Sequence, residues 1–411
     1  MDIEIFKNNI NFVFGYSDTK DMGMTTAQIQ FLELLRAGLW GRPADPALFP
    51  IGGTDWKAVL RIAKEQTVPV IIADGIETLP ADRWPSKEAM MKLMMLRIKT
   101  SQMHQLLNTT LNQIVTALND ENIPSVLLKG QGVAQNYMKP ESRNCGDIDL
   151  YTGPVGYERA CEIISEMNQG AHKVEEESQR HMHLHLNGIE IEVHRLASKM
   201  PGKKLNENFQ HWTKESIDDH FCSDELKLWD NNGTNIHLAT GTFDAFFILY
   251  HAVRHMFSEG VGFRQICDWT MYLHRHHAEI NSKELAKRLR EFHMETIWRE
   301  FSILAVNALG LPANELPIYP EGMCTDASGK LKGSAKTDKI LNHIFISGNF
   351  GRFDVNGRDH SQAPYLKRKW RSFRFQSIRL IKLFRLFPKY TASYMWHWLS
   401  SAIYRFVTES D

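Results

Sequence analysis

The sequence is short of cysteine, of long apolar runs and of net charge. Its five cysteines are an odd number, widely spaced and without a C-x-x-C pair, which is typical of reduced thiols rather than of a disulfide framework or a zinc ribbon. No stretch approaches the ~18 uninterrupted apolar residues of a membrane-spanning helix. The N-terminal stretch MDIEIFKNNINFVFGYSDTK lacks the basic region and apolar core of a signal peptide. We therefore expect a cytoplasmic protein.

Positive and negative charges are equal in number, with 48 Lys and Arg against 48 Asp and Glu. This balance argues against a dedicated nucleic-acid coat protein or an acidic tail protein. Apolar residues make up 43% and charged residues 23%, which excludes the compositions typical of disordered, collagen-like and coiled-coil chains. At about 150 residues per domain, the length predicts roughly two to three domains.

Helical and strand-like patterns divide the chain into four segments. Apolar residues recur at steps of three and four up to residue 118, and 90–118 has few helix breakers. Short apolar runs and turn signals then predict a mixed core. We expect an α+β protein with a helical region at 1–118, an α/β core at 119–200, a polar connector at 201–234 and a second helical region at 235–411.

Six elements are predicted within the core. A strand at 125–128 leads through a Lys-Gly turn into a helix at 133–137, and a second strand occupies 147–151. A helix follows at 157–167. The runs 181–186 and 189–194 flank Asn187-Gly188, and Asn-Gly between alternating runs is a strong hairpin signal.

The most informative stretch is 147–151, which reads D-I-D-L-Y. Residues two apart on a strand point to the same face, roughly 6.5–7 Å apart, so Asp147 and Asp149 would repel each other unless a cation lay between them. Mg²⁺ or Mn²⁺ suits such carboxylates and keeps positions open for phosphate oxygens. An isolated D-x-D pair is more often a turn or a solvated edge.

A third carboxylate is available on the strand at 189–194, which reads I-E-I-E-V-H. Glu190, Glu192 and His194 share one face of this strand. Either glutamate could complete a two-metal site of the phosphoryl-transfer type.

Three motifs occur in the order L-L-K-G-Q-G, S-R-N-C-G-D-I-D-L-Y and I-E-V-H-R between residues 127 and 195. In this order they resemble the nucleotidyltransferase superfamily built on the DNA polymerase beta-like catalytic fold. More narrowly, they are similar to an uncharacterised bacterial family that reads L-K-G, R-x-x-G-D-I-D-L and E-x-H. The resemblance implies an NTP substrate, Mg²⁺ or Mn²⁺ as cofactor with two ions, and a mixed-sheet catalytic core flanked by helices.

Matched position by position, the resemblance implies that Asp147, Asp149 and Glu192 are the catalytic, metal-binding carboxylates. It also implies that Gly130 is the glycine of the strand-to-helix turn that approaches the triphosphate. The superfamily usually has Gly-Ser or Gly-Gly at this turn. Here Gln131 follows the glycine, so the hydroxyl that would bind phosphate is absent, and Gln131 itself is the expected nucleotide-binding residue at this position of the turn.

Two cations lie close to these motifs. Lys129 and Arg143 could hold phosphate oxygens, the arginine in a bidentate manner; a solvated position or an ion pair with Glu141 or Asp147 would also explain them. We expect a metal-dependent nucleotidyltransferase that moves a nucleotidyl group from an NTP to an acceptor. The alternative is a catalytically degenerate module that binds nucleotide or a partner protein, consistent with Gln131 at the turn.

Histidines form two weaker patterns. His181, His183 and His185 alternate on one strand face and could bind zinc or copper, but a half-exposed polar face explains them as well, and substrate contact is the favoured functional role. His251 and His255 match a zinc-helix spacing without its glutamate, so zinc is not expected there. Their region could close over the acceptor or form a buried network. The possible substrate contacts are Glu190, His194, His251, His255, Arg264 and Asp268.

The stretch 365–406 contains ten Lys and Arg, no acid and many aromatic residues. Such a segment could bind RNA or lie on an anionic membrane surface. A packed helix pair with a solvated basic face is the favoured explanation, and association with the inner face of the membrane is the next.

Overall fold

The computed structural model describes residues 23–168, 180–221, 223, 225–319, 325–326, 329–349 and 365–408, the last with the backbone alone at 365–369, 371–372 and 401–408. The N-terminal stretch, Cys222, Cys324 and several basic side chains of 365–406 lie outside the described residues. The described cysteines that carry free thiols are Cys145, Cys161 and Cys267.

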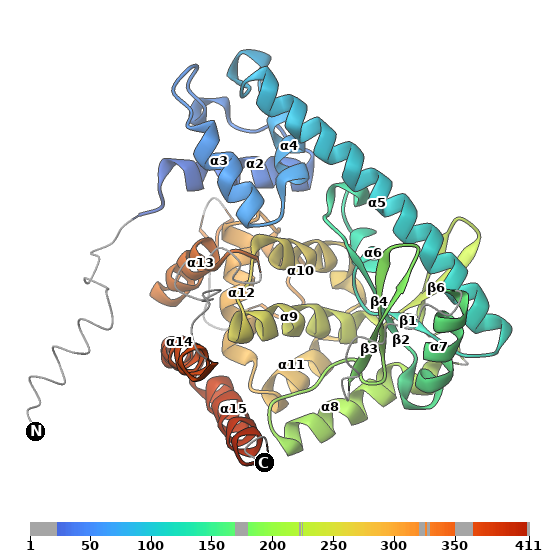
Figure 1. Ribbon diagram of the computed structural model, residues 1–411. Coiled ribbons are helices and arrows are strands. Elements are labelled where there is room, and N and C mark those ends of the chain that lie inside the picture. The colour runs from blue at the N-terminus through green and yellow to red at the C-terminus, as the bar shows by residue number, and fades with distance from the viewer. Residues whose placement is uncertain are drawn as a thin grey trace, which may run out of the picture.

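A six-stranded mixed sheet and surrounding helices form the fold, so the expected α+β class is confirmed (Figure 1). The strand order is β3-β4-β2-β1-β6-β5. Pairs β2–β4 and β1–β6 are parallel, and the other three pairs are antiparallel. The strands are β1 Val126–Leu127, β2 Asp147–Tyr151, β3 His181–Leu186, β4 Ile189–His194, β5 Lys227–Asn231 and β6 Thr234–Leu238.

The described part of the N-terminal region, from residue 23 on, contains the α-helices α2 Thr26–Trp40, α3 Trp56–Glu65, α4 Pro69–Glu77 and α5 Lys87–Asp120. Thr25 and Gln28 form a capping box at the start of α2, and Gly41 ends it in the left-handed conformation. Helix α5 is the expected long helix, with 34 residues. It runs from the N-terminal helices to the sheet (Figure 1), with contacts to α4 at one end and to β2, β6 and α7 (Gly153–Met167) at the other.

The predicted strands of the core agree with β2, β3 and β4 at both ends. Asn187 and Gly188 both have positive φ, as the tight turn of this hairpin requires. The first strand is shorter than expected, and the helix after the Lys-Gly turn is the single turn α6 (Gln131–Ala134) rather than 133–137.

The segment 201–234, expected as a connector, holds helix α8 (Lys203–Ser216) and strand β5, which pairs with β6 at the edge of the sheet. Trp212 and Phe209 are buried against α9 and carry much of the packing of α8. The sheet therefore extends past residue 200, because a polar strand at a sheet edge leaves little apolar pattern in the sequence.

Helices dominate the rest of the described chain. They are α9 Gly241–Ser258, α10 Phe263–His276, α11 Ser282–Glu291, α12 Glu295–Asn307, α13 Ala335–Ser347, α14 Tyr365–Leu386 and α15 Pro388–Thr408. Among the described residues, no helix is long and apolar enough to cross a bilayer.

The two faces of the sheet have different chemistry, which positions the site. Ile148, Leu150 and Ile191 face a buried apolar cluster that includes Leu111 of α5 and Tyr157 of α7. Because side chains alternate along a strand, the acids of β2 and β4 point to the opposite face. That face is turned toward α9 and α10.

Candidate functional site

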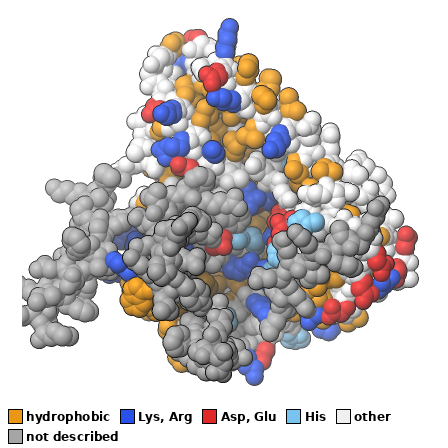
Figure 2. All heavy atoms as spheres, in the orientation of Figure 1, with side chains coloured by type: hydrophobic (Ala, Val, Ile, Leu, Met, Phe, Trp, Pro, Cys, Tyr) orange, Lys and Arg blue, Asp and Glu red, His pale blue; other side chains and the backbone are white. Residues whose placement is uncertain are grey.

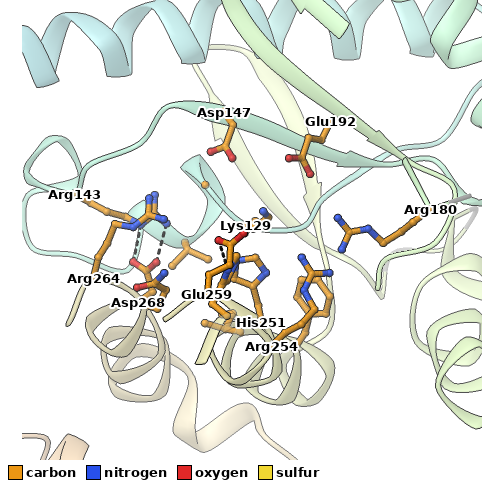
Figure 3. A pocket seen from close by; sticks show the side chains of 16 residues that line it. Lys129, Arg143, Asp147, Arg180, Glu192, His251, Arg254, Glu259, Arg264 and Asp268 are labelled. Carbon is orange, nitrogen blue, oxygen red and sulfur yellow. Dashed lines mark hydrogen bonds and ion pairs between the residues drawn. The ribbon is translucent and has the colours of Figure 1, made fainter. Parts of the chain in front are cut away.

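Three carboxylates converge on the polar face of the sheet. Parallel pairing of β2 with β4 sets Asp147 opposite Glu190 and Asp149 opposite Glu192. Oxygen atoms of Asp147, Asp149 and Glu192 all lie within 4.8 Å of one another. In Figure 3, Asp147 and Glu192 point from the sheet into a cavity. The structure therefore brings together the three carboxylates that the sequence singled out.

The donor set fits a hard divalent cation. All three groups offer oxygen, which Mg²⁺ and Mn²⁺ prefer. Asp149 is fully buried, and its Oδ2 has no hydrogen-bond partner, which is costly for a charged oxygen unless a ligand completes it. The residues present thus suit the metal that the sequence predicts.

Charges around Glu192 keep it ionised. Burial acts to raise the pKa of Glu192, but a hydrogen bond from His194 and the positive charge of Lys129 hold that pKa well below its ordinary value. Lys129 Nζ lies 2.8 Å from Asp149 Oδ1. Burial disfavours the charged ammonium, yet the three nearby carboxylates raise the pKa of Lys129. Glu192 and Lys129 are therefore both charged before any cation binds.

The turn after β1 brings backbone close to β2. Gly130 has a φ of 63°, in the left-handed region, and a Cβ at this position would lie 3.3 Å from the carbonyl oxygen of Asp147. Glycine is the residue that tolerates both conditions. Gly130 also lines the cavity, so backbone rather than a side chain faces the carboxylates here.

A cavity of about 320 Å³ lies between the polar face of the sheet and helices α9 and α10. Figure 2 shows acidic, basic and histidine side chains gathered around a hollow near the centre of the molecule. The charged and histidine residues that line the cavity are Lys129, Arg143, Asp147, Arg180, Glu192, His251, Arg254, His255, Glu259, Arg264 and Asp268.

Arg143 and Asp268 form a buried ion pair on one wall of this cavity. The Nε and Nη2 atoms of Arg143 donate to the two carboxylate oxygens of Asp268 at 2.6 and 2.8 Å, and Tyr137 Oη donates to the same carboxylate at 2.7 Å. Burial opposes the charge on Arg143, but Asp268 raises the pKa of the guanidinium. The ion-pair partner of Arg143 is thus Asp268, and not Glu141 or Asp147, which the sequence offered as partners.

Gln131 does not line the cavity. Its side chain is buried and donates to Asn108 Oδ1 and to the carbonyl of His104 on α5. The amide therefore fixes α6 against α5. The shorter side chain of a serine at this position would not reach these partners on α5.

The rings of His251 and His255 pack edge to face on α9, with their Nε2 atoms 3.1 Å apart. Burial, together with the charge of Lys129 and other nearby cations, lowers the pKa of His251 far below its ordinary value and that of His255 to about 3. Both rings are neutral near pH 7 and can donate or accept a hydrogen bond in the cavity. Arg264 donates to the carbonyl of Asn144 at 3.1 Å and lines the cavity from α10.

His194 and Glu190 occupy different environments. His194 is buried, with Nε2 3.0 Å from Asp149 Oδ1 and 3.3 Å from Glu192 Oε2, so it supports two of the carboxylates. Glu190 is exposed, and its Oε1 atom lies 2.8 Å from His183 Nδ1, within hydrogen-bond distance. Of these two expected contacts, neither lines the cavity.

Two basic residues that line the cavity, Arg180 and Arg254, were not among the candidate residues predicted from the sequence. Arg180 precedes β3 and points into the cavity beside Glu192 (Figure 3), and Arg254 projects from α9. The signal for Arg180 was a basic residue directly before a strand that pairs with the acidic strand β4. For Arg254, it was a basic residue three positions after His251 on a predicted helix.

Comparison with known proteins identifies the family of the chain. No curated protein and no solved structure matches the chain. A family described as uncharacterised nucleotidyltransferase matches residues 52–310, which span α3 to α12 and include every residue of the cavity. The chain belongs to this family of uncharacterised nucleotidyltransferases.

Proposed function

We propose that the protein is a metal-dependent nucleotidyltransferase that uses an NTP as donor. The observation that carries this proposal is the convergence of Asp147, Asp149 and Glu192 on a cavity whose other walls supply cations. Anionic triphosphate oxygens need positive partners, and carboxylates alone would repel them. The order of motifs along the chain supports a polymerase beta-like catalytic core for the family fold.

In this proposal the three carboxylates hold one or two Mg²⁺ or Mn²⁺ ions. Such ions, when bound, supply Lewis-acid stabilisation of the charge that develops on the phosphate oxygens. Lys129, Arg180 and Arg254 hold the triphosphate, and Gly130 lets the turn approach it closely. Arg143 positions the 140–146 loop through Asp268.

The transfer step forms one bond and breaks one. An oxygen of the acceptor attacks the α-phosphorus, the bond from this phosphorus to the bridging oxygen breaks, and pyrophosphate leaves. When the acceptor is a hydroxyl, its proton passes to a carboxylate of the cluster and then to water. His251, His255 and Arg264 lie on the opposite wall, where the acceptor would contact them.

The test combines turnover with binding. Incubation of the full chain with α-labelled NTPs, Mn²⁺ and cell extract should transfer label to an acceptor, whereas γ-labelled NTPs should not. Calorimetric titration with NTP and Mg²⁺ is the parallel measurement. Binding without transfer from any labelled NTP would favour a nucleotide sensor instead, and the absence of both would contradict the proposal.

A second proposal concerns the C-terminal helices. Trp370, Phe373, Ile381 and Phe384 are exposed at helical spacing along α14, with exposed fractions between 41% and 65%. Arg374, Lys382, Arg385 and Lys389 are exposed beside them. An apolar stripe with basic neighbours and no acid suits peripheral binding to an anionic membrane surface. Arg379 and Tyr390 face the other way and pack on the end of α9.

Vesicle sedimentation tests this second proposal. We expect binding to vesicles that contain phosphatidylserine, weakened about tenfold or more by Lys382→Gln with Arg385→Gln, because each cation near such a surface contributes about 1 kcal/mol. The matched control is Lys57→Gln with Lys64→Gln on α3. Equal binding to neutral vesicles, or binding to RNA alone, would contradict the proposal.

A further inference from the structure

The hairpin β3–β4 carries a cluster of imidazoles directly beside the carboxylates. Antiparallel pairing sets His181 opposite His194 and His183 opposite Glu192. The ring centroid of His181 lies 4.6 Å from that of His183 and 5.0 Å from that of His194. Ligand atoms of His181, Glu192 and His194 all lie within 4.8 Å of one another. The ligand atoms of this group are therefore mainly imidazole nitrogens, whereas those of the adjacent carboxylate cluster are all oxygens.

We propose that His181, His194 and Glu192 form a second metal site, selective for a borderline ion such as Zn²⁺, which shares Glu192 with the carboxylate cluster. Two imidazoles and one carboxylate are a ligand set that zinc takes readily while keeping one position open. Hard ions such as Mg²⁺ avoid this set, since they bind oxygen.

The separations are close to those a zinc ion needs. Glu192 Oε2 lies 3.3 Å from His194 Nε2 and 4.0 Å from His181 Nε2. Two ligands about 2.0–2.1 Å from a tetrahedral zinc are about 3.3 Å apart. The distance from Glu192 Oε2 to His181 Nε2 must therefore shorten by about 0.7 Å to reach the tetrahedral value, and a change in the side-chain torsions of His181 would supply this.

Hydrogen bonds show what occupies the position of the ion in this state. Arg180 Nε donates to His181 Nδ1 at 2.7 Å, so the proton of the neutral His181 ring is on Nε2. That atom lies 2.8 Å from His183 Nε2, and His183 Nδ1 lies 2.8 Å from Glu190 Oε1. A proton on His181 Nε2 thus stands where the metal would bind. His183 lies next to this position. Its ring is oriented by the carboxylate of Glu190, as the rings of zinc-binding histidines usually are by a carboxylate.

Metal binding would change the neighbouring cavity in two ways. Zinc on His181 Nε2 moves the ring proton to Nδ1, where it meets the Nε–H of Arg180, so Arg180 must turn away. Zinc also takes an oxygen of Glu192 from the carboxylate cluster. If the proposed nucleotidyl transfer is correct, Zn²⁺ inhibits it; this consequence rests on the proposed function, whereas the metal site does not.

Direct metal binding tests the site. Equilibrium dialysis of the full chain against Zn²⁺, without nucleotide and with excess Mg²⁺, should retain one zinc. His181→Asn should weaken this binding by at least about a hundredfold, since even loss of an outer partner of a zinc ligand costs up to about a hundredfold. His185→Asn, on the same strand face but exposed and outside the ligand set, should not change it.

The remaining variants separate this site from the carboxylate cluster. Asp147→Asn should retain zinc, and a loss equal to that of His181→Asn would place the ion among the carboxylates and overturn the proposal. So would the absence of zinc in the unaltered chain. Paramagnetically shifted imidazole N–H resonances of the Co²⁺-loaded chain report the ligands without any substitution, so a folding defect in a variant cannot hide the answer. Label transfer that is absent in every variant bears on the proposed function alone.

Discussion

Asp147→Asn combined with Asp149→Asn should lower label transfer by about a thousandfold or more. The substitution keeps the size of both side chains but removes the two charges that, with Glu192, converge within 4.8 Å. A site that loses its cation loses several kcal/mol of transition-state stabilisation. The measurement is the initial rate of label transfer at saturating Mn²⁺.

The matched control for this pair is Asp230→Asn on β5. Asp230 belongs to the same sheet, is exposed, and accepts a hydrogen bond from the backbone of Gly233 that asparagine can also accept. We expect the rate of this variant to stay within about twofold of the unaltered chain. Transfer that persists in the double variant would remove these two carboxylates from the chemistry.

Asp268→Asn should lower the free energy of unfolding by about 3–5 kcal/mol. The guanidinium of Arg143 is buried, and its two hydrogen bonds to Asp268 balance its charge. Removal of one member of a buried ion pair leaves the other charge without compensation, which costs about this much. Denaturation with urea, followed by circular dichroism, measures the change.

Two further variants define this prediction. Lys92→Ala breaks an ion pair with Glu88 in which both side chains are more than 70% exposed, and it should change the free energy of unfolding far less than Asp268→Asn, because water and salt screen an exposed pair. Arg143→Met with Asp268→Leu removes both charges and should be less destabilising than Asp268→Asn alone. Equal losses for the buried and the exposed pair would show that burial does not govern the strength of this contact.

Local patterns predicted the strands that hold the carboxylates. Alternation over 147–151 and 189–194, with the Asn187-Gly188 turn, defined β2 and β4 to the residue. Once these strands are parallel neighbours in register, the convergence of Asp149 and Glu192 follows from geometry. This part of the candidate site was predictable because it depends on period and turn chemistry alone.

Contacts between distant segments were not predictable in the same way. Asp268 meets Arg143 across 125 positions of sequence, and nothing near either residue indicates the other. In the sequence, Gln131 stands where a phosphate-binding turn usually has a small residue. In the structure, its side chain binds Asn108 on α5, which the sequence around Gln131 does not indicate. Strand β5 lies at a sheet edge and only one of its five side chains is buried, so the sequence of 201–234 resembles that of a connector.

The long helix α5 has a consequence for how the molecule holds together. At about 1.5 Å per residue its 34 residues span about 50 Å, and the same helix contacts α4 near its start and packs Leu107, Leu111 and Leu118 on the sheet near its end. A cut at the predicted boundary of residue 118 would fall inside this helix and strip the apolar face of the sheet. Helix α5 therefore joins the N-terminal helices to the six-stranded sheet, and its loss would expose the apolar surfaces that it covers at both of its ends.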